Sequence, residues 1–160
     1  MNIPCSKSFT RRALCALFVI LSGCTPKCPQ WEIEKISTPC HCFSAGKVFY
    51  PVQDTFSGIE VELDRGPSDT RMYLNIYSIP LLGSCEEESK ILIAVTINEI
   101  KEVIEADLLH GNQRILVPLD IMNQIIEALL GNQYVSIAVG QYCAEIPPQN
   151  FQTAYQNLYR

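Results

Sequence analysis

Thiol and imidazole groups gather in the first third of the chain, where Cys28, Cys40, His41 and Cys42 fall within fifteen residues. Thiolates and imidazoles are good ligands for zinc and copper, so one interpretation is a metal or redox centre. Zinc sites usually separate their cysteines by two to four residues, however, and neighbouring side chains of an extended segment point to opposite sides. Disulfide bonds are therefore the favoured interpretation of these cysteines.

A cysteine activated by a nearby histidine would make a thiol enzyme. The chain holds two histidines, His41 and His110, and neither lies in a local signature of thiol or serine hydrolases. The sequence also lacks a glycine-rich phosphate loop, paired zinc histidines and a calcium-loop pattern, so no cofactor is expected. An envelope enzyme is an alternative only through a site assembled from distant residues.

Acidic side chains alternate with apolar ones at Glu60, Glu62 and Asp64. This period of two predicts a half-buried strand whose acidic face is solvated. Together with Glu86-Glu87-Glu88, the same carboxylates could instead bind a divalent cation or a basic segment.

The next predicted strand, residues 70–77, carries the candidate interaction patch. Its members share the outward face of the strand and combine a cation with two aromatic rings, a combination common at binding hot spots. They are Arg71, Tyr73 and Tyr77.

The first 24 residues have the layout of an export signal, with Lys7, Arg11 and Arg12 before an apolar run at 13–21. That run is too short to span a bilayer, which takes roughly 20 residues. The tetrapeptide Leu21-Ser22-Gly23-Cys24 then resembles the lipobox of bacterial lipoproteins, which is cut just before its cysteine. The resemblance implies that residues 1–23 are a signal peptide. It also implies that Cys24 carries a diacylglycerol and an amide-linked acyl chain such as palmitate.

By the same resemblance the protein is expected on a membrane of the bacterial cell envelope. Asp after the acylated cysteine is the usual signal for retention in the inner membrane, and Thr25 stands there, which favours the outer membrane. Multiple acyl chains make such an anchor stable, because one chain holds only marginally. The small size and surplus cysteines are also similar to cysteine-rich envelope lipoproteins of chlamydia-type bacteria.

An oxidising envelope favours disulfides. Besides Cys24, residues 24–160 contain five cysteines, an odd number, so one of them must stay free, pair between chains or bind something. The disulfide candidates are Cys28, Cys40, Cys42, Cys85 and Cys143.

Charge excludes one class of partner. Residues 1–23 contain three Lys and Arg and no acid, so their removal changes the net charge from −5 to −8. A chain this acidic is repelled by phosphate backbones, and no basic stripe is present. Nucleic acid is therefore excluded, which leaves the membrane, through Cys24, and an envelope protein as expected partners.

Residues 24–46 contain Pro26, Pro29 and Pro39, which prevent a continuous helix and predict an extended tether. Trp31 within it either docks onto the folded domain or acts as an interfacial aromatic. Residues 47–160 are predicted to form that domain, and with residues 1–23 removed the chain is long enough for one hydrophobic core.

The domain is predicted to be α+β, with an antiparallel sheet of about six strands. Residues 91–97 are apolar nearly throughout, which predicts a central strand buried on both faces. Apolar spacing predicts an amphipathic helix at about 120–130 on one face of the sheet and a short C-terminal helix at about 149–159. We expect a lipid-anchored envelope protein that acts as a binding or structural module, with an envelope enzyme and a metal or redox protein as alternatives.

Overall fold

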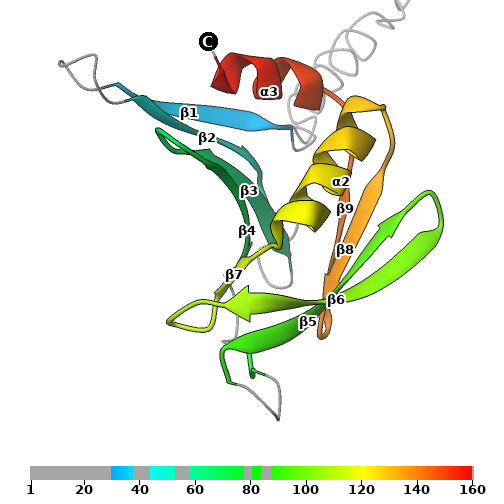
Figure 1. Cartoon of the computed structure of the whole chain (residues 1–160). Coiled ribbons are helices and arrows are strands. Elements are labelled where there is room, and N and C mark those ends of the chain that lie inside the picture. The colour runs from blue at the N-terminus through cyan, green and yellow to red at the C-terminus, as the bar shows by residue number, and fades with distance from the viewer. Residues whose placement is uncertain (1–29, 38–43, 53–57, 78–80, 84–87, 160) are drawn as a thin grey trace, which may run out of the picture.

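A computed structural model of the chain describes residues 30–37, 44–52, 58–77, 81–83 and 88–159. They form an α+β fold with one open antiparallel sheet and two helices (Figure 1). The elements are β1 (Glu32–Ser37), β2 (Ser44–Tyr50), β3 (Ile59–Arg65), β4 (Thr70–Ile76), β5 (Lys90–Ile97), β6 (Ile100–Leu108), β7 (Arg114–Leu116), α2 (Leu119–Leu130), β8 (Val135–Val139), β9 (Tyr142–Ile146) and α3 (Phe151–Leu158). The α+β class, the antiparallel sheet and the two helices are confirmed.

The sheet has nine strands in the order β1-β2-β3-β4-β7-β6-β5-β8-β9, which corrects the prediction of about six. β1 and the start of β2 come from the segment interpreted as a tether. The two strands pair with each other, with Glu32 of β1 opposite Phe49 of β2. The prolines of that segment flank β1 without interrupting it, so its backbone N–H groups are available for the ladder. At the other edge, a two-residue turn beginning at Gly140 (φ 57°) joins β8 to β9, which pair with each other.

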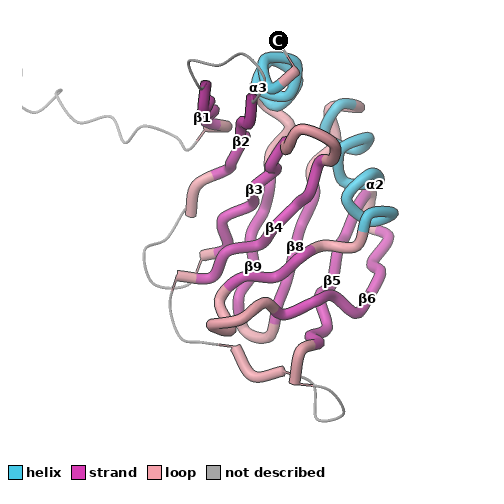
Figure 2. The backbone as a smooth tube through the Cα atoms, turned by 60° about the vertical axis from the view of Figure 1, so that its left-hand side comes forward, coloured by secondary structure: helices cyan, strands magenta, loops and turns pink. Residues whose placement is uncertain are grey.

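One face of the sheet is apolar and faces both helices. Alternate residues of its strands point to this inner face, and α2 packs its buried side chains Ile121, Met122, Ile125, Ile126, Ala128 and Leu129 towards it. α2 connects β7 with β8 and makes its main sheet contacts with β4 and β8. Figure 2 shows α2 running along the sheet with α3 at one end of the molecule. No helix among the described residues is long and apolar enough to cross a membrane.

The strand at 91–97 is not buried on both faces, which corrects that prediction. Ile91, Ile93 and Val95 of β5 point into the core, whereas Leu92 is 60% exposed on the outer face. Both helices pack on the inner face, so the outer side of β5 meets solvent.

The β1–β2 hairpin is fastened to α3. Trp31 is buried, and its indole N–H donates a 3.0 Å hydrogen bond to the Pro147 carbonyl. Its ring lies 4.7 Å from that of Phe151, measured between centroids, and 5.4 Å from that of Tyr50. Trp31 therefore docks onto the domain, as one of its two interpretations predicted, and joins a segment close to the proposed lipid site to the C-terminal helix.

Candidate functional site

Two regions of the structure gather side chains that could bind or react. The first is a polar network on the outer face of β3, β4 and β7. Glu60, Glu62 and Asn75 are its buried members, and cross-strand pairing places Glu60 beside Asn75. The prediction that the acidic face of β3 is solvated is therefore wrong for Glu60 and Glu62.

Hydrogen bonds explain how these carboxylates are buried. The Asn75 amide nitrogen lies 3.0 Å from Glu60 Oε1 and 3.0 Å from Glu62 Oε2, and the Tyr77 hydroxyl donates to Glu60 Oε1 at 2.8 Å. Arg114 of β7 donates to Glu62 at 2.6 Å and to Asp64 at 3.2 Å. Buried charges are tolerated when they are paired and hydrogen-bonded in this way.

The same contacts shift the acid–base properties of the network. Burial, followed by the charge of Glu62, raises the pKa of Asp64 to about 6, although Arg114 and Lys47 oppose the shift. Burial and the hydrogen bond to Glu60 raise the pKa of Tyr77 to about 12. A carboxyl group with a pKa of about 6, such as Asp64, changes charge just below neutral pH.

The predicted patch of Arg71, Tyr73 and Tyr77 lies on one side of β4 and of the residue that follows it, and each member has partners of its own. Arg71 is exposed and bonds Asp69 in the β3–β4 turn at 2.7 Å. The guanidinium of Arg114 stacks over the Tyr73 ring, 3.9 Å from its centroid, which covers that face of the ring. Tyr77 is 63% exposed with its hydroxyl held by Glu60. These partners make the network a structural element of the outer face.

Within the described residues, no group of three or more His, Cys, Asp or Glu has a geometry suited to a metal ion. The candidate ligands Cys28, Cys40, His41 and Cys42 lie outside the described residues, as do Cys24 and Cys85. Cys143, on the edge strand β9, is exposed and free, with its sulfur 3.7 Å from the Ser136 hydroxyl. The disulfide assignments therefore stay predictions.

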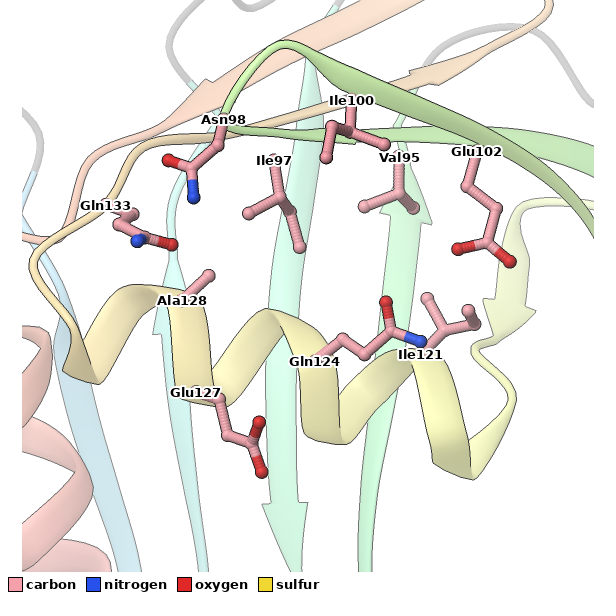
Figure 3. Close-up of a pocket in the computed structure, with 10 residues that line it drawn as sticks. All are labelled: Val95, Ile97, Asn98, Ile100, Glu102, Ile121, Gln124, Glu127, Ala128 and Gln133. Atoms are coloured by element: carbon pink, nitrogen blue, oxygen red, sulfur yellow. The ribbon is translucent and has the colours of Figure 1, made fainter.

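The second region is a groove between α2 and the β5–β6 hairpin, with a volume of about 350 Å³ (Figure 3). Val95 and Ile97 of β5 point from the sheet towards the helix, and Ala128 and Gln124 point from α2 towards them. Glu102 extends from β6 over the N-terminal half of the helix. The groove thus combines an apolar floor with polar groups at its margin, which is the usual composition of a ligand site.

The hairpin that forms one wall of this groove turns tightly. Ile97 pairs with Ile100, so only Asn98 and Glu99 form the turn, with φ angles of 50° and 66°. Two consecutive positive φ angles are typical of a type I′ turn, which favours Asn-Gly and places Glu99 under strain. The turn holds Ile100 at the mouth of the groove, where its side chain is 74% exposed.

A second hollow of about 580 Å³ lies across the hairpin tip and is lined in part by Glu99, Tyr134 and Glu145. It shares Asn98 and Gln133 with the groove. A third hollow of about 500 Å³ includes Arg71, but the cations and acids at its margin pair with one another as Arg71–Asp69 and Lys90–Asp107.

Sequence reasoning did not find the groove. It predicted a strand at 91–97 and a helix at about 120–130, but it did not identify the tight turn after the strand. One signal was available in the sequence: Asn98 and Glu99 lie between Ile97 and Ile100, and a two-residue turn that begins with Asn is common in hairpins. Comparisons with protein-family models, curated proteins and solved structures found no match to this chain.

Proposed function

We propose that the protein is lipid-anchored through Cys24 in a bacterial cell envelope, with the outer membrane favoured, and that its domain is a binding module. The anchor is supported by Leu21-Ser22-Gly23-Cys24 after a short apolar run. Binding is supported by one structural observation, the groove with an apolar floor beside α2, with Ile100 exposed at its mouth. A large exposed aliphatic side chain next to a concave apolar surface is typical of interaction sites.

The anchor is tested by intact-mass analysis of the protein extracted from membranes. We expect a chain that starts at Cys24 and carries lipid, and a Cys24→Ala variant that leaves the membrane fraction. Cys28→Ala is the matched control, because it removes a cysteine four residues away and should keep both the lipid and the membrane location. A wild-type chain that begins elsewhere without lipid would refute the anchor.

The binding module is tested with a photo-crosslinking amino acid in place of Ile100 in the membrane-anchored protein. Position 82 serves as the control, because Leu82 is even more exposed, at 89%, and does not line the groove. We expect a discrete crosslinked species when the amino acid is at position 100 and none when it is at position 82. Equal crosslinking from both positions would contradict a binding role for the groove.

A further inference from the structure

The groove borders an open sheet edge. β6 has nine residues and β7 only three, and β7 pairs with Asp107 and Leu108 of β6. Among the described residues no strand pairs with the β7 side of β6 from residue 100 to 106. After β7, Val117 donates its N–H to the Met72 carbonyl of β4, and Pro118, which has no N–H, leads the chain into α2.

The backbone groups that face this open edge can be identified. Leu109 N–H donates to the Arg114 carbonyl, on the β7 side, whereas Leu108 N–H donates to Ser89, on the β5 side. Backbone groups alternate in direction along a strand. The N–H and C=O groups of Lys101, Val103 and Glu105 therefore point outward along the free edge.

The side chains at this edge are exposed on both faces of β6, although the sheet buries one of its faces elsewhere. Residues 100–103 of β6 are all exposed, whichever face they occupy, because the hairpin extends beyond α2 (Figure 1). Ile100 is 74% exposed beside the groove and Val103 is 57% exposed on the outer face. An added strand would pair with this edge and would place alternate side chains beside Ile100 on the groove side and beside Val103 on the outer side.

The charges around the free edge indicate which kind of strand could bind there. Glu102 and Glu105 are exposed within the free edge segment 100–106, and Glu127 of α2 lines the groove together with Glu102. The groove lining includes no Lys or Arg, and Lys101 is the one cation within the segment. In the hollow beside residues 105–106, Arg71 and Lys90 are paired with Asp69 and Asp107. Like charges opposed across strands destabilise pairing, and opposite charges favour it. The carboxylates also repel the phosphates of lipid headgroups.

We infer that the free edge of β6 at residues 100–106 binds an extended, positively charged segment of an envelope protein, which adds to the sheet as a tenth strand with aliphatic side chains in the groove. This inference rests on the proposed binding module and names its partner chemistry. Backbone hydrogen bonds to Lys101, Val103 and Glu105 supply the pairing, and the carboxylates select a basic segment.

The test uses the lipid-free domain in the Cys24→Ala full chain and a fluorescein-labelled octapeptide of alternating lysine and valine. Two control peptides are measured by fluorescence anisotropy: one alternates glutamate and valine, and the other carries N-methyl groups on alternate residues of the basic peptide. The N-methylated peptide keeps every charge and side chain but cannot complete a strand ladder. We expect the unmodified basic peptide to bind at least tenfold more tightly than either control.

Two pairs of variants locate the site. Val103→Pro removes an outward N–H and should weaken binding of the basic peptide at least tenfold, whereas Val103→Thr keeps the N–H and should change it less than twofold. Proline is tolerated on the open side of an edge strand, and circular dichroism verifies that the variant folds. Glu102→Gln should weaken binding several-fold at low salt, and Glu88→Gln, which removes the same charge near the other end of β5, should not.

Four outcomes would overturn the inference: equal binding of the N-methylated peptide, equal binding of the acidic peptide, no binding of the basic peptide, or identical affinities for Val103→Pro and Val103→Thr. The partner crosslinked through position 100 distinguishes failure of this inference from failure of the proposed function. A crosslinked segment rich in lysine or arginine supports the inference. A discrete crosslink to an acidic segment or a lipid leaves the groove a binding site and refutes this partner.

Discussion

Arg114 is predicted to be the residue on which the outer-face network depends. It is the cation that bonds both Glu62 and Asp64, and its guanidinium stacks on Tyr73. Arg114→Met keeps the aliphatic stem but leaves the Glu62 carboxylate, whose side chain is 6% exposed, without its cation and with the hydrogen bond from Asn75. The variant therefore removes the positive charge and keeps most of the packing of the side chain.

The size of the effect follows from burial. Removing one partner of a buried ion pair costs about 3–5 kcal/mol, because the other charge stays buried and unpaired. The Arg114 side chain is 39% exposed, so solvent already screens part of the attraction. We therefore expect Arg114→Met to lose about 2–3 kcal/mol of unfolding free energy at pH 7, and Arg114→Lys to lose about 1 kcal/mol through its poorer hydrogen-bond geometry.

The matched control is Arg71→Met. Arg71 also bonds one carboxylate, that of Asp69 at 2.7 Å, but both side chains are about half exposed. An exposed pair of this kind contributes little to stability because solvent screens it, so Arg71→Met should cost much less than Arg114→Met. The pair of variants thus compares the same chemical change in a buried and an exposed setting.

The assay is a urea titration followed by circular dichroism at pH 7 and at pH 5. Without the cation, the pKa values of the neighbouring carboxylates rise, so the folded Arg114→Met protein takes up protons as the pH falls. The decrease in unfolding free energy caused by the substitution should therefore be smaller at pH 5 than at pH 7. A loss below about 1 kcal/mol at pH 7 with an unchanged urea dependence would refute the reasoning. An equal loss at both pH values would do the same.

Three further changes are predicted to alter stability, each measured by the same titration. Ile125→Ala should cost about 2–5 kcal/mol because Ile125 is fully buried, whereas Leu119→Ala, at a side chain 66% exposed, should cost less than about 0.5 kcal/mol. Glu99→Gly should stabilise the fold by about 0.5–1 kcal/mol, because glycine relieves the positive φ of the hairpin turn; a net loss would contradict a strained turn. Asp64 has a folded pKa of about 6 against an ordinary value of 3.8, so the folded state holds its proton more tightly and stability falls as the pH rises from about 4 to 6. Asp64→Asn should remove this pH-dependent part of the stability, which is worth about 1 kcal/mol because the side chain is 37% exposed and partly screened. If the stability of the variant fell as much as that of the wild type between about pH 4 and 6, the raised pKa of Asp64 would be refuted.

The helix α2 could be predicted from the sequence because its signal is local. Ile121, Ile125 and Leu129 recur at helical spacing, and Gly131 follows the last turn. The structure places the helix at Leu119–Leu130, one residue from its predicted start and at its predicted end. A periodic apolar face specifies both the type of element and the face that is buried.

The buried acids could not be predicted, because their partners come from distant strands. Alternation at Glu60, Glu62 and Asp64 identifies a strand with two unlike faces, but it does not reveal that β7 brings Arg114 beside them. That neighbour follows from the strand order, in which β4 pairs with β7 and not with β5. A local period determines which side chains share a face, whereas the topology of the sheet determines whether that face is solvated.

The groove and the open edge of β6 have a common origin in Pro118. A proline cannot donate an N–H to a sheet, but the consequence of Pro118 depends on what surrounds it. β7 ends two residues before Pro118, so most of β6 keeps an uncovered edge, and α2 begins directly after Pro118 and forms one wall of the groove. A longer β7 would cover the edge and move α2 along the sheet. One residue without an N–H therefore favours the uncovered β6 edge on which the proposed strand addition depends.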